Sequence, residues 1–224
     1  IGHLSRERSV HFELAVAQWV HLWAQFYMGD LKTMSAQVPQ QYQEAMGRED
    51  LLSASGNVLG LAAVAHLNVL GVEETRRRTG HLFQQWSSTG VHLQHFWYFV
   101  SNILMDLYAD EPERAYSRVN STWKMLKRSL LLLVPSIRTE AYFLSGRCHL
   151  ALARRQPDPR KSRHFARACR DARKLVRGQL GYTDGMARVL LAEATRLRGE
   201  EDAARLQWLE AIDVLQDAHM ALFA

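Results

Sequence analysis

The chain is punctuated by a small residue followed by an acid, a step that returns about every forty residues. It occurs at Gly29-Asp30, Gly71-Val72-Glu73, Ala109-Asp110 and Gly199-Glu200. Glycine or alanine is suited to closing one helix, and an acid favours the positive N-terminal end of the next. The pattern therefore predicts helix hairpins. Such hairpins stack on one another, because a single pair is too small to bury its apolar face alone.

Hydrophobic periodicity indicates helices along the whole chain and no alternating pattern typical of a strand. The first helices of five antiparallel pairs are predicted at 6–28, 51–70, 91–108, 135–155 and 184–198. Their partners are predicted at 30–46, 73–86, 111–127, 159–176 and 200–217. The expected fold is all-α, a superhelical array of about five antiparallel helix hairpins. We expect it to form one domain over 1–224, a fragment of a longer chain.

Three local features interrupt this regularity. Pro39 falls inside a predicted helix and should kink or break it. Gly56 and Gly60 each cost a helix about 1 kcal/mol relative to alanine, which indicates a close contact with another helix there. The aliphatic run 130–134 ends at a proline and is expected to be a buried link between helices.

The last hairpin has the most regular spacing of small and large residues. Its first helix has Leu191 beside Ala192, and its second has Ala204, Trp208 and Ala211. This small, large, small spacing resembles the tetratricopeptide repeat, a helix-turn-helix unit that stacks into a solenoid. The resemblance implies that Trp208 lies in the core between the two alanines.

Three longer segments carry a second resemblance, and together they span most of the chain. They are YMGDLKTMSAQVPQQYQEA, TGVHLQHFWYFVSNILMDLYADEPERAYSRV and RSLLLLVPSIRTEAYFLSGRCHLALA. They resemble the C-terminal helical-repeat region of large bacterial signalling proteins, in which a serine/threonine kinase or a STAND-type ATPase module precedes the repeats. The resemblance implies a regulatory or partner-binding part, with the residues of the enzyme outside this segment.

The sequence contains no recognisable enzyme motif. It has no G-x-x-x-x-G-K-[ST] phosphate loop, no kinase glycine loop, no H-R-D stretch and no G-x-S-x-G nucleophile turn. His92 and His95 share a helical face, but Asp106 lies roughly 16 Å further along that helix and cannot bind the same ion. We therefore expect no catalysis, no metal and no cofactor.

The compartment is inferred from apolar runs and cysteines. A membrane helix needs roughly 20 apolar residues, and the most apolar helix is interrupted by polar side chains, so we expect no membrane span. Cys148 and Cys169 are too few for a disulfide framework and are expected to be buried fillers. A reducing compartment, the cytoplasm, is favoured.

A recognition groove is the first candidate site. On the helix 91–108, aromatic and hydrogen-bonding side chains gather on one face: His92, His95, Tyr98, Phe99, Asn102 and Asp106. The next first helix presents Arg138, Tyr142, Ser145 and His149 in the same way. Since first helices line the concave side of stacked hairpins, we expect these residues to form a partner-binding groove. The alternative is that the aromatic residues pack between repeats.

A basic stripe on the helix 159–176 and its edges is the second candidate site. Its members recur every three or four residues: Arg160, Arg163, Arg167, Arg170, Lys174 and Arg177. With 28 basic and 23 acidic residues, a net charge of +5, such a stripe could bind anions such as nucleic-acid phosphates. The acidic helix 200–217 could instead neutralise it, so nucleic acid is not the favoured partner.

The favoured function is a non-catalytic interaction or regulatory segment of a bacterial signalling protein, which binds another protein or another domain of its own chain. Two alternatives remain open. A sensor would hold a small ligand or a peptide inside the curve of the array, and a nucleic-acid binder would use the basic helix.

Overall fold

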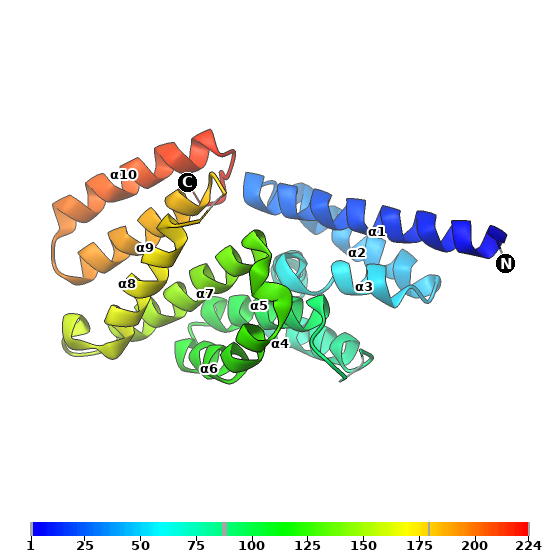
Figure 1. Cartoon of the computed structure of the whole chain (residues 1–224), viewed down its shortest axis with the longest axis horizontal. Helices are drawn as coiled ribbons and strands as arrows, with labels where there is room; N and C mark the ends of the chain where they lie inside the picture. The colour runs from blue at the N-terminus through cyan, green and yellow to red at the C-terminus, as the bar shows by residue number, and fades with distance from the viewer. Residues whose placement is uncertain (1, 87–88, 179, 224) are drawn as a thin grey trace. The chain divides into compact units, whose positions relative to one another are not determined.

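Helices account for all regular structure that the computed structural model describes, namely residues 2–86, 89–178 and 180–223. Within these ranges there are ten α-helices, three short 3-10 segments and no strand (Figure 1). The all-α expectation is confirmed for these ranges. The chain divides into two compact units, Ile1–Ser101 and Asn102–Ala224. None of the described helices combines the length and the apolar character that a bilayer span requires.

The first unit contains four helices, a 3-10 turn and the start of a fifth helix. Their bounds are α1 Gly2–Met28, α2 Leu31–Gly47, α3 Leu51–Gly56, η1 Gly60–Ala62, α4 Ala63–Phe83 and α5 Leu93–Tyr108. The break after α1 follows the predicted punctuation. Gly29 has a φ of +79°, and the Asp30 carboxylate accepts a hydrogen bond from the Thr33 amide, 3.2 Å away, at the start of α2.

The third and fourth helices are divided at a different place from the predicted one. The predicted helix 51–70 already ends at Gly56, and Gly60 has a φ of +70°, which breaks helical geometry. The amide of Gly60 donates instead to Ser101 Oγ, 2.7 Å away. The predicted boundary at Gly71 is a kink within α4, where φ is +75° and ψ is 177°. Glycine therefore interrupts this region at two positions.

Pro39 does not end its helix, which corrects the expectation of a break. Helix α2 continues through it to Gly47. Proline removes one backbone donor, whereas Met34 and Val38 on the same helix are fully buried. Their burial holds the segment in helical form.

The predicted close contact at Gly56 is present and involves an indole ring. A Cβ atom on Gly56 would lie 1.5 Å from Nε1 of Trp19. Trp19 packs edge-on against Trp97, with ring centroids 4.7 Å apart, and Trp97 also contacts Trp23 at 6.2 Å. The absence of a side chain at Gly56 therefore allows a three-tryptophan cluster to form the core of the first unit.

The second unit contains the end of α5 and all later elements. These are α6 Pro112–Arg128, η2 Leu130–Leu133, α7 Pro135–Arg154, η3 Pro159–Lys161, α8 Arg163–Val176, α9 Thr183–Leu197 and α10 Glu201–Asp217. Helix α7 packs on both α8 and α9, α8 packs on α9, and α9 packs on α10. A Cβ atom on Gly146 would lie 2.5 Å from Leu190, and one on Gly185 would lie 2.7 Å from Leu215. Glycine thus allows α9 to approach α7 and α10 closely.

Two expectations about burial in the second unit are wrong. The run 130–134 is not a buried link, because Leu130 is 78% and Leu133 is 70% exposed. It forms a 3-10 segment, in which positions three apart share a face, so both leucines point to solvent together. Trp208 is only half-buried, although Ala204 and Ala211 are buried as expected. A helix at the end of the packed series has no further helix to cover the indole.

The two cysteines differ in their surroundings. Cys148 on α7 is fully buried, and burial raises the pKa of its thiol to about 12. Cys169 on α8 is half-buried, and burial also raises its pKa. Only Cys148 is the buried filler that the sequence analysis expects.

Candidate functional site

Most of the α5 residues predicted to line the groove are not exposed to solvent. His92 is exposed and His95 and Tyr98 are half-buried, but Phe99, Asn102 and Asp106 are buried. The Tyr98 ring stacks on Phe83 of α4, with ring centroids 4.1 Å apart. Between Phe96 and Asp106, every α5 side chain except that of Tyr98 is buried, so the helix has no open polar face there. The groove interpretation of this helix is therefore wrong.

Asp106 has a structural role at the end of this stripe. Its carboxylate is fully buried and accepts a hydrogen bond from Arg118 Nε, 2.7 Å away, while Arg114 Nε lies at 3.5 Å. Both arginines belong to α6. The ion pairs join α5 to α6 and compensate the buried charge.

The α7 part of the predicted groove faces the neighbouring helix α8. Ser145 is buried, and its Oγ donates to Oδ2 of Asp171, 2.7 Å away. The Asp171 carboxylate also accepts from Arg167 Nε at 3.0 Å. Burial raises the pKa of Asp171, and the hydrogen bonds from Ser145 and Arg167 oppose this rise. These groups lie inside the α7–α8 hairpin and not in an open groove.

A pair of histidines, His149 buried and His164 half-buried, lies further along the same interface. Nδ1 of His149 and Nδ1 of His164 are 2.9 Å apart, so one ring must donate and the other accept. Tyr116 of α6 contacts both rings, with centroid distances of 5.4 and 5.0 Å. Burial, followed by the charges of His164 and nearby arginines, lowers the pKa of His149 to about 3. His149 is therefore neutral at physiological pH and buried, which excludes it from a recognition surface.

Cations of α8 cover the aromatic residues at the other end of this interface. Lys174 Nζ lies 4.5 Å from the ring centroid of Tyr142 and donates to its hydroxyl, 3.2 Å away. The guanidinium carbon of Arg167 lies 5.4 Å from the ring centroid of Trp123. The Trp123 and Tyr142 rings contact each other at 5.4 Å. These cation–π contacts hold the two cations in fixed positions.

The rest of the basic stripe is exposed. Within the described ranges, Arg163, Arg170 and Arg177 form no ion pair, and Arg160 has only a distant one, 3.9 Å from Asp158. The exposed unpaired members and the two cation–π members form the α8 basic surface: Arg163, Arg167, Arg170, Lys174 and Arg177. Arg160 precedes α8, on η3, and is not included. Arg138 of α7 is half-buried.

The acidic helix α10 does not neutralise this surface. Helix α9 packs on both α8 and α10, and Glu210 of α10 pairs with Arg188 of α9 at 2.8 Å. No ion pair between α8 and α10 occurs among the described residues. The expected compensation by α10 is therefore not found among the described residues, and Arg163, Arg170 and Arg177 keep unpaired charges.

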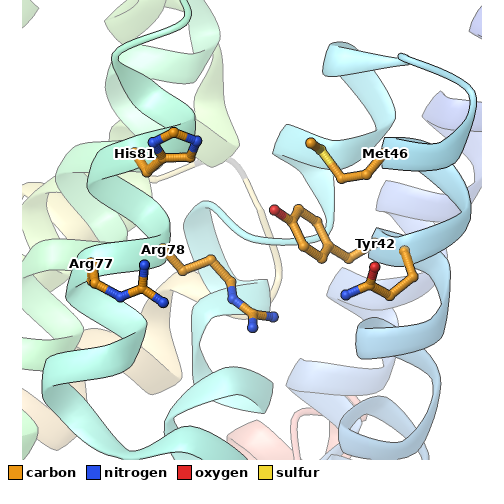
Figure 2. Close-up of a pocket in the computed structure, with 6 residues that line it drawn as sticks. Tyr42, Met46, Arg77, Arg78 and His81 are labelled. Carbon is orange, nitrogen blue, oxygen red and sulfur yellow. The ribbon is translucent and has the colours of Figure 1, made fainter.

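A pocket that the sequence pattern does not predict lies between α2 and α4. It has a volume of about 280 Å³ and is lined by Tyr42, Gln43, Met46, Arg77, Arg78 and His81. Figure 2 shows arginine and histidine side chains extending from α4 toward Tyr42 and Met46 of α2. The signal in the sequence is the segment EETRRR at 73–78, in which three arginines follow only two acids.

Comparison with known proteins assigns no family to the chain. No family model, curated protein or solved structure matches the chain. Within the described ranges, no group of three or more histidine, cysteine, aspartate or glutamate side chains is arranged to hold a metal ion.

Proposed function

We propose that the chain is a non-catalytic interaction or regulatory segment, and that the α8 basic surface docks onto an acidic surface of another protein or of another domain of its own chain. The observation that carries the proposal is that Arg163, Arg170 and Arg177 are exposed and without ion pairs among the described residues. Aligned unpaired cations steer an acidic partner and set its register.

The base of this surface supports the same proposal. Arg167 is held by the buried carboxylate of Asp171, and Lys174 is held against Tyr142. Cations that are fixed before binding lose less side-chain entropy when a partner arrives. The surface is therefore preorganised for a partner of complementary charge.

A protein partner fits these observations better than the two alternatives. Proteins that bind single-stranded nucleic acid without sequence preference stack bases on aromatic faces, but here Arg167 and Lys174 already cover Trp123 and Tyr142. A sensor with a ligand inside its curve needs the predicted groove, yet Ser145 and His149 are buried within a hairpin.

The helical-repeat context is part of the proposal. The packing of α7 on both α8 and α9, and of α9 on α10, supports a tetratricopeptide-like stack for this part of the chain. We propose a bacterial signalling protein with a kinase or ATPase module as the parent, on the basis of the sequence resemblance. Such segments place a regulatory surface next to an enzyme.

Site-specific photo-crosslinking tests the proposed docking surface. Ala166 is exposed on α8 beside Arg163 and Arg170, so a photo-reactive amino acid placed there should form an adduct with the partner in the source cell. We expect an adduct that protease degrades and nuclease leaves intact, and whose protein component has an acidic surface. The double variant Arg163→Glu/Arg170→Glu should reduce its yield about tenfold, because it reverses two of the docking charges.

The matched control makes the same change in net charge elsewhere. Lys32 of α2 and Arg205 of α10 are exposed, so Lys32→Glu/Arg205→Glu should leave the adduct yield unchanged. An equal loss in both double variants would show that only net charge matters and would contradict a defined surface. An adduct that nuclease destroys would show that the partner is a nucleic acid and not a protein.

A further inference from the structure

The α2–α4 pocket in the first unit carries an inference separate from the α8 basic surface. The orientation of α4 decides which of its side chains line the pocket. Thr75, Thr79 and Leu82 on this helix are fully buried. These residues turn one face of the helix inward, and Arg78 and His81 lie beside that face and line the pocket.

The three consecutive arginines of α4 have unequal partners. Arg76 pairs with Glu73 at 2.7 Å, and Arg77 makes two hydrogen bonds to Glu74 at 2.6 and 2.8 Å. The residue three positions before Arg78 is Thr75, which is buried and donates to a backbone carbonyl. Among the described side chains, none forms a hydrogen bond or an ion pair with Arg78.

Arg78 is positioned by an aromatic ring. Its guanidinium carbon lies 5.2 Å from the ring centroid of Tyr42. Tyr42 in turn contacts the edge of His66 at 6.2 Å, and His66 is buried and bonded to the backbone oxygen of Asn57 at 2.8 Å. A rigid support thus keeps the guanidinium in the pocket and leaves its donors available.

The remaining lining is of mixed character. Met46 is 37% exposed and, with the Tyr42 ring, offers an apolar wall (Figure 2). The lining contains no aspartate or glutamate. Such a combination of a fixed cation, hydrogen-bond donors and an aromatic wall is suited to an oxyanion on an apolar body.

We infer that the α2–α4 pocket binds a small aromatic molecule that carries one oxyanion, a phosphate or a carboxylate. Arg78, which lies over one face of the Tyr42 ring, receives the oxyanion, and Met46 with the rest of the Tyr42 ring contacts the aromatic part of the ligand. The volume of about 280 Å³ is at the lower end of small-molecule pockets, so the ligand has one ring and not a nucleotide's bulk.

Calorimetric titration of the whole 224-residue chain tests this inference directly. The probes are phenyl phosphate, benzoate, inorganic phosphate and the uncharged benzyl alcohol. We expect phenyl phosphate or benzoate to bind with a dissociation constant on the order of 1 mM. Inorganic phosphate and benzyl alcohol should bind at least fivefold more weakly, since each lacks one half of the recognised structure. The better aromatic anion identifies the oxyanion.

Variants of α4 separate the pocket from general charge effects. Arg78→Gln should weaken binding of the better aromatic anion by roughly tenfold or more, because it removes the charged donor. Glu74→Gln should strengthen binding a few-fold, since it releases Arg77 and removes a negative charge beside the pocket. Arg48→Gln is the control, because Arg48 is exposed just beyond α2 and does not line the pocket.

Several results would overturn the inference. The inference fails if the wild-type chain binds neither aromatic anion, or if Arg78→Gln and Arg48→Gln bind the better aromatic anion with equal affinity. If inorganic phosphate binds as tightly as phenyl phosphate, the ligand does not need an aromatic ring and the inference is wrong. A circular dichroism melt of each variant shows whether the fold is intact, and Glu74→Gln gives a second readout in the opposite direction if Arg78→Gln unfolds.

Discussion

Replacing Gly56 by alanine should lower the free energy of unfolding by about 3 kcal/mol. The new Cβ would lie 1.5 Å from Nε1 and 2.1 Å from Cδ1 of Trp19, far inside van der Waals contact. Trp19 is only 8% exposed and packs edge-on against Trp97. A rigid indole within a cluster of rings cannot move aside as the end of a flexible chain would, so α3 or Trp19 must be displaced.

Gly47→Ala is the matched control for this experiment. Gly47 ends α2, and a Cβ atom there would have nothing within 4 Å. We expect a change within about 0.5 kcal/mol, because the site has room for a methyl group. Urea denaturation followed by circular dichroism measures both variants. Equal stabilities of the two variants would show that Trp19 does not contact α3 closely in solution.

Acidification should destabilise the native chain through His149. Its pKa is about 3 in the folded state and about 6.5 when unfolded, so between these values the unfolded chain binds a proton that the folded chain does not. Stability is therefore complete above pH 6.5 and is lost as the pH falls toward 3. From pH 7 to pH 5 this one histidine should cost about 2 kcal/mol of unfolding free energy.

His149→Gln tests the source of this loss, because glutamine does not titrate and can still hydrogen-bond His164. Urea midpoints at pH 7 and pH 5 should differ less in this variant than in the wild type. A residual acid loss is expected, since burial also lowers the pKa of His164 and His66. His21→Gln, at an exposed position of α1, should retain the wild-type pH dependence. An unchanged pH dependence in His149→Gln would mean that His149 is accessible to solvent.

Local sequence signals predicted much of the helical architecture. Gly29 and Gly199 close helices with φ of +79° and +82°, because glycine adopts these angles without strain. At the Ala109-Asp110 step, the positive φ of +55° belongs to Asp110 and not to the small residue. Short-range backbone chemistry decides such positions, so they can be inferred without knowledge of the tertiary fold.

Features that depend on distant residues could not be predicted in this way. The partner of the close contact at Gly56 is Trp19, a residue far away in the sequence that the glycine itself does not identify. Pro39 is tolerated in α2 because neighbouring side chains are buried, and periodicity does not report the strength of that burial. The exposed leucines 130 and 133 look like core residues by composition alone.

The candidate sites show the same division. The basic stripe could be predicted from spacing, since helical period alone aligns Arg163, Arg170 and Arg177. The groove could not, because the polar residues Ser145 and His149 have partners on α8 that make their burial possible. A polar face on a helix is equally typical of solvent exposure and of a hydrogen-bonded interface.

Because the thiol of Cys148 is buried, the rate at which it is alkylated reports local opening of the fold. Alkylating reagents attack the thiolate, and a pKa of about 12 together with full burial leaves almost none available in the native fold. Labelling of Cys148 must therefore wait for α7 to separate from its neighbours. Its rate, followed by mass spectrometry without any denaturant, measures how often the helices around α7 open, and Cys169 on the same molecule serves as the less protected reference.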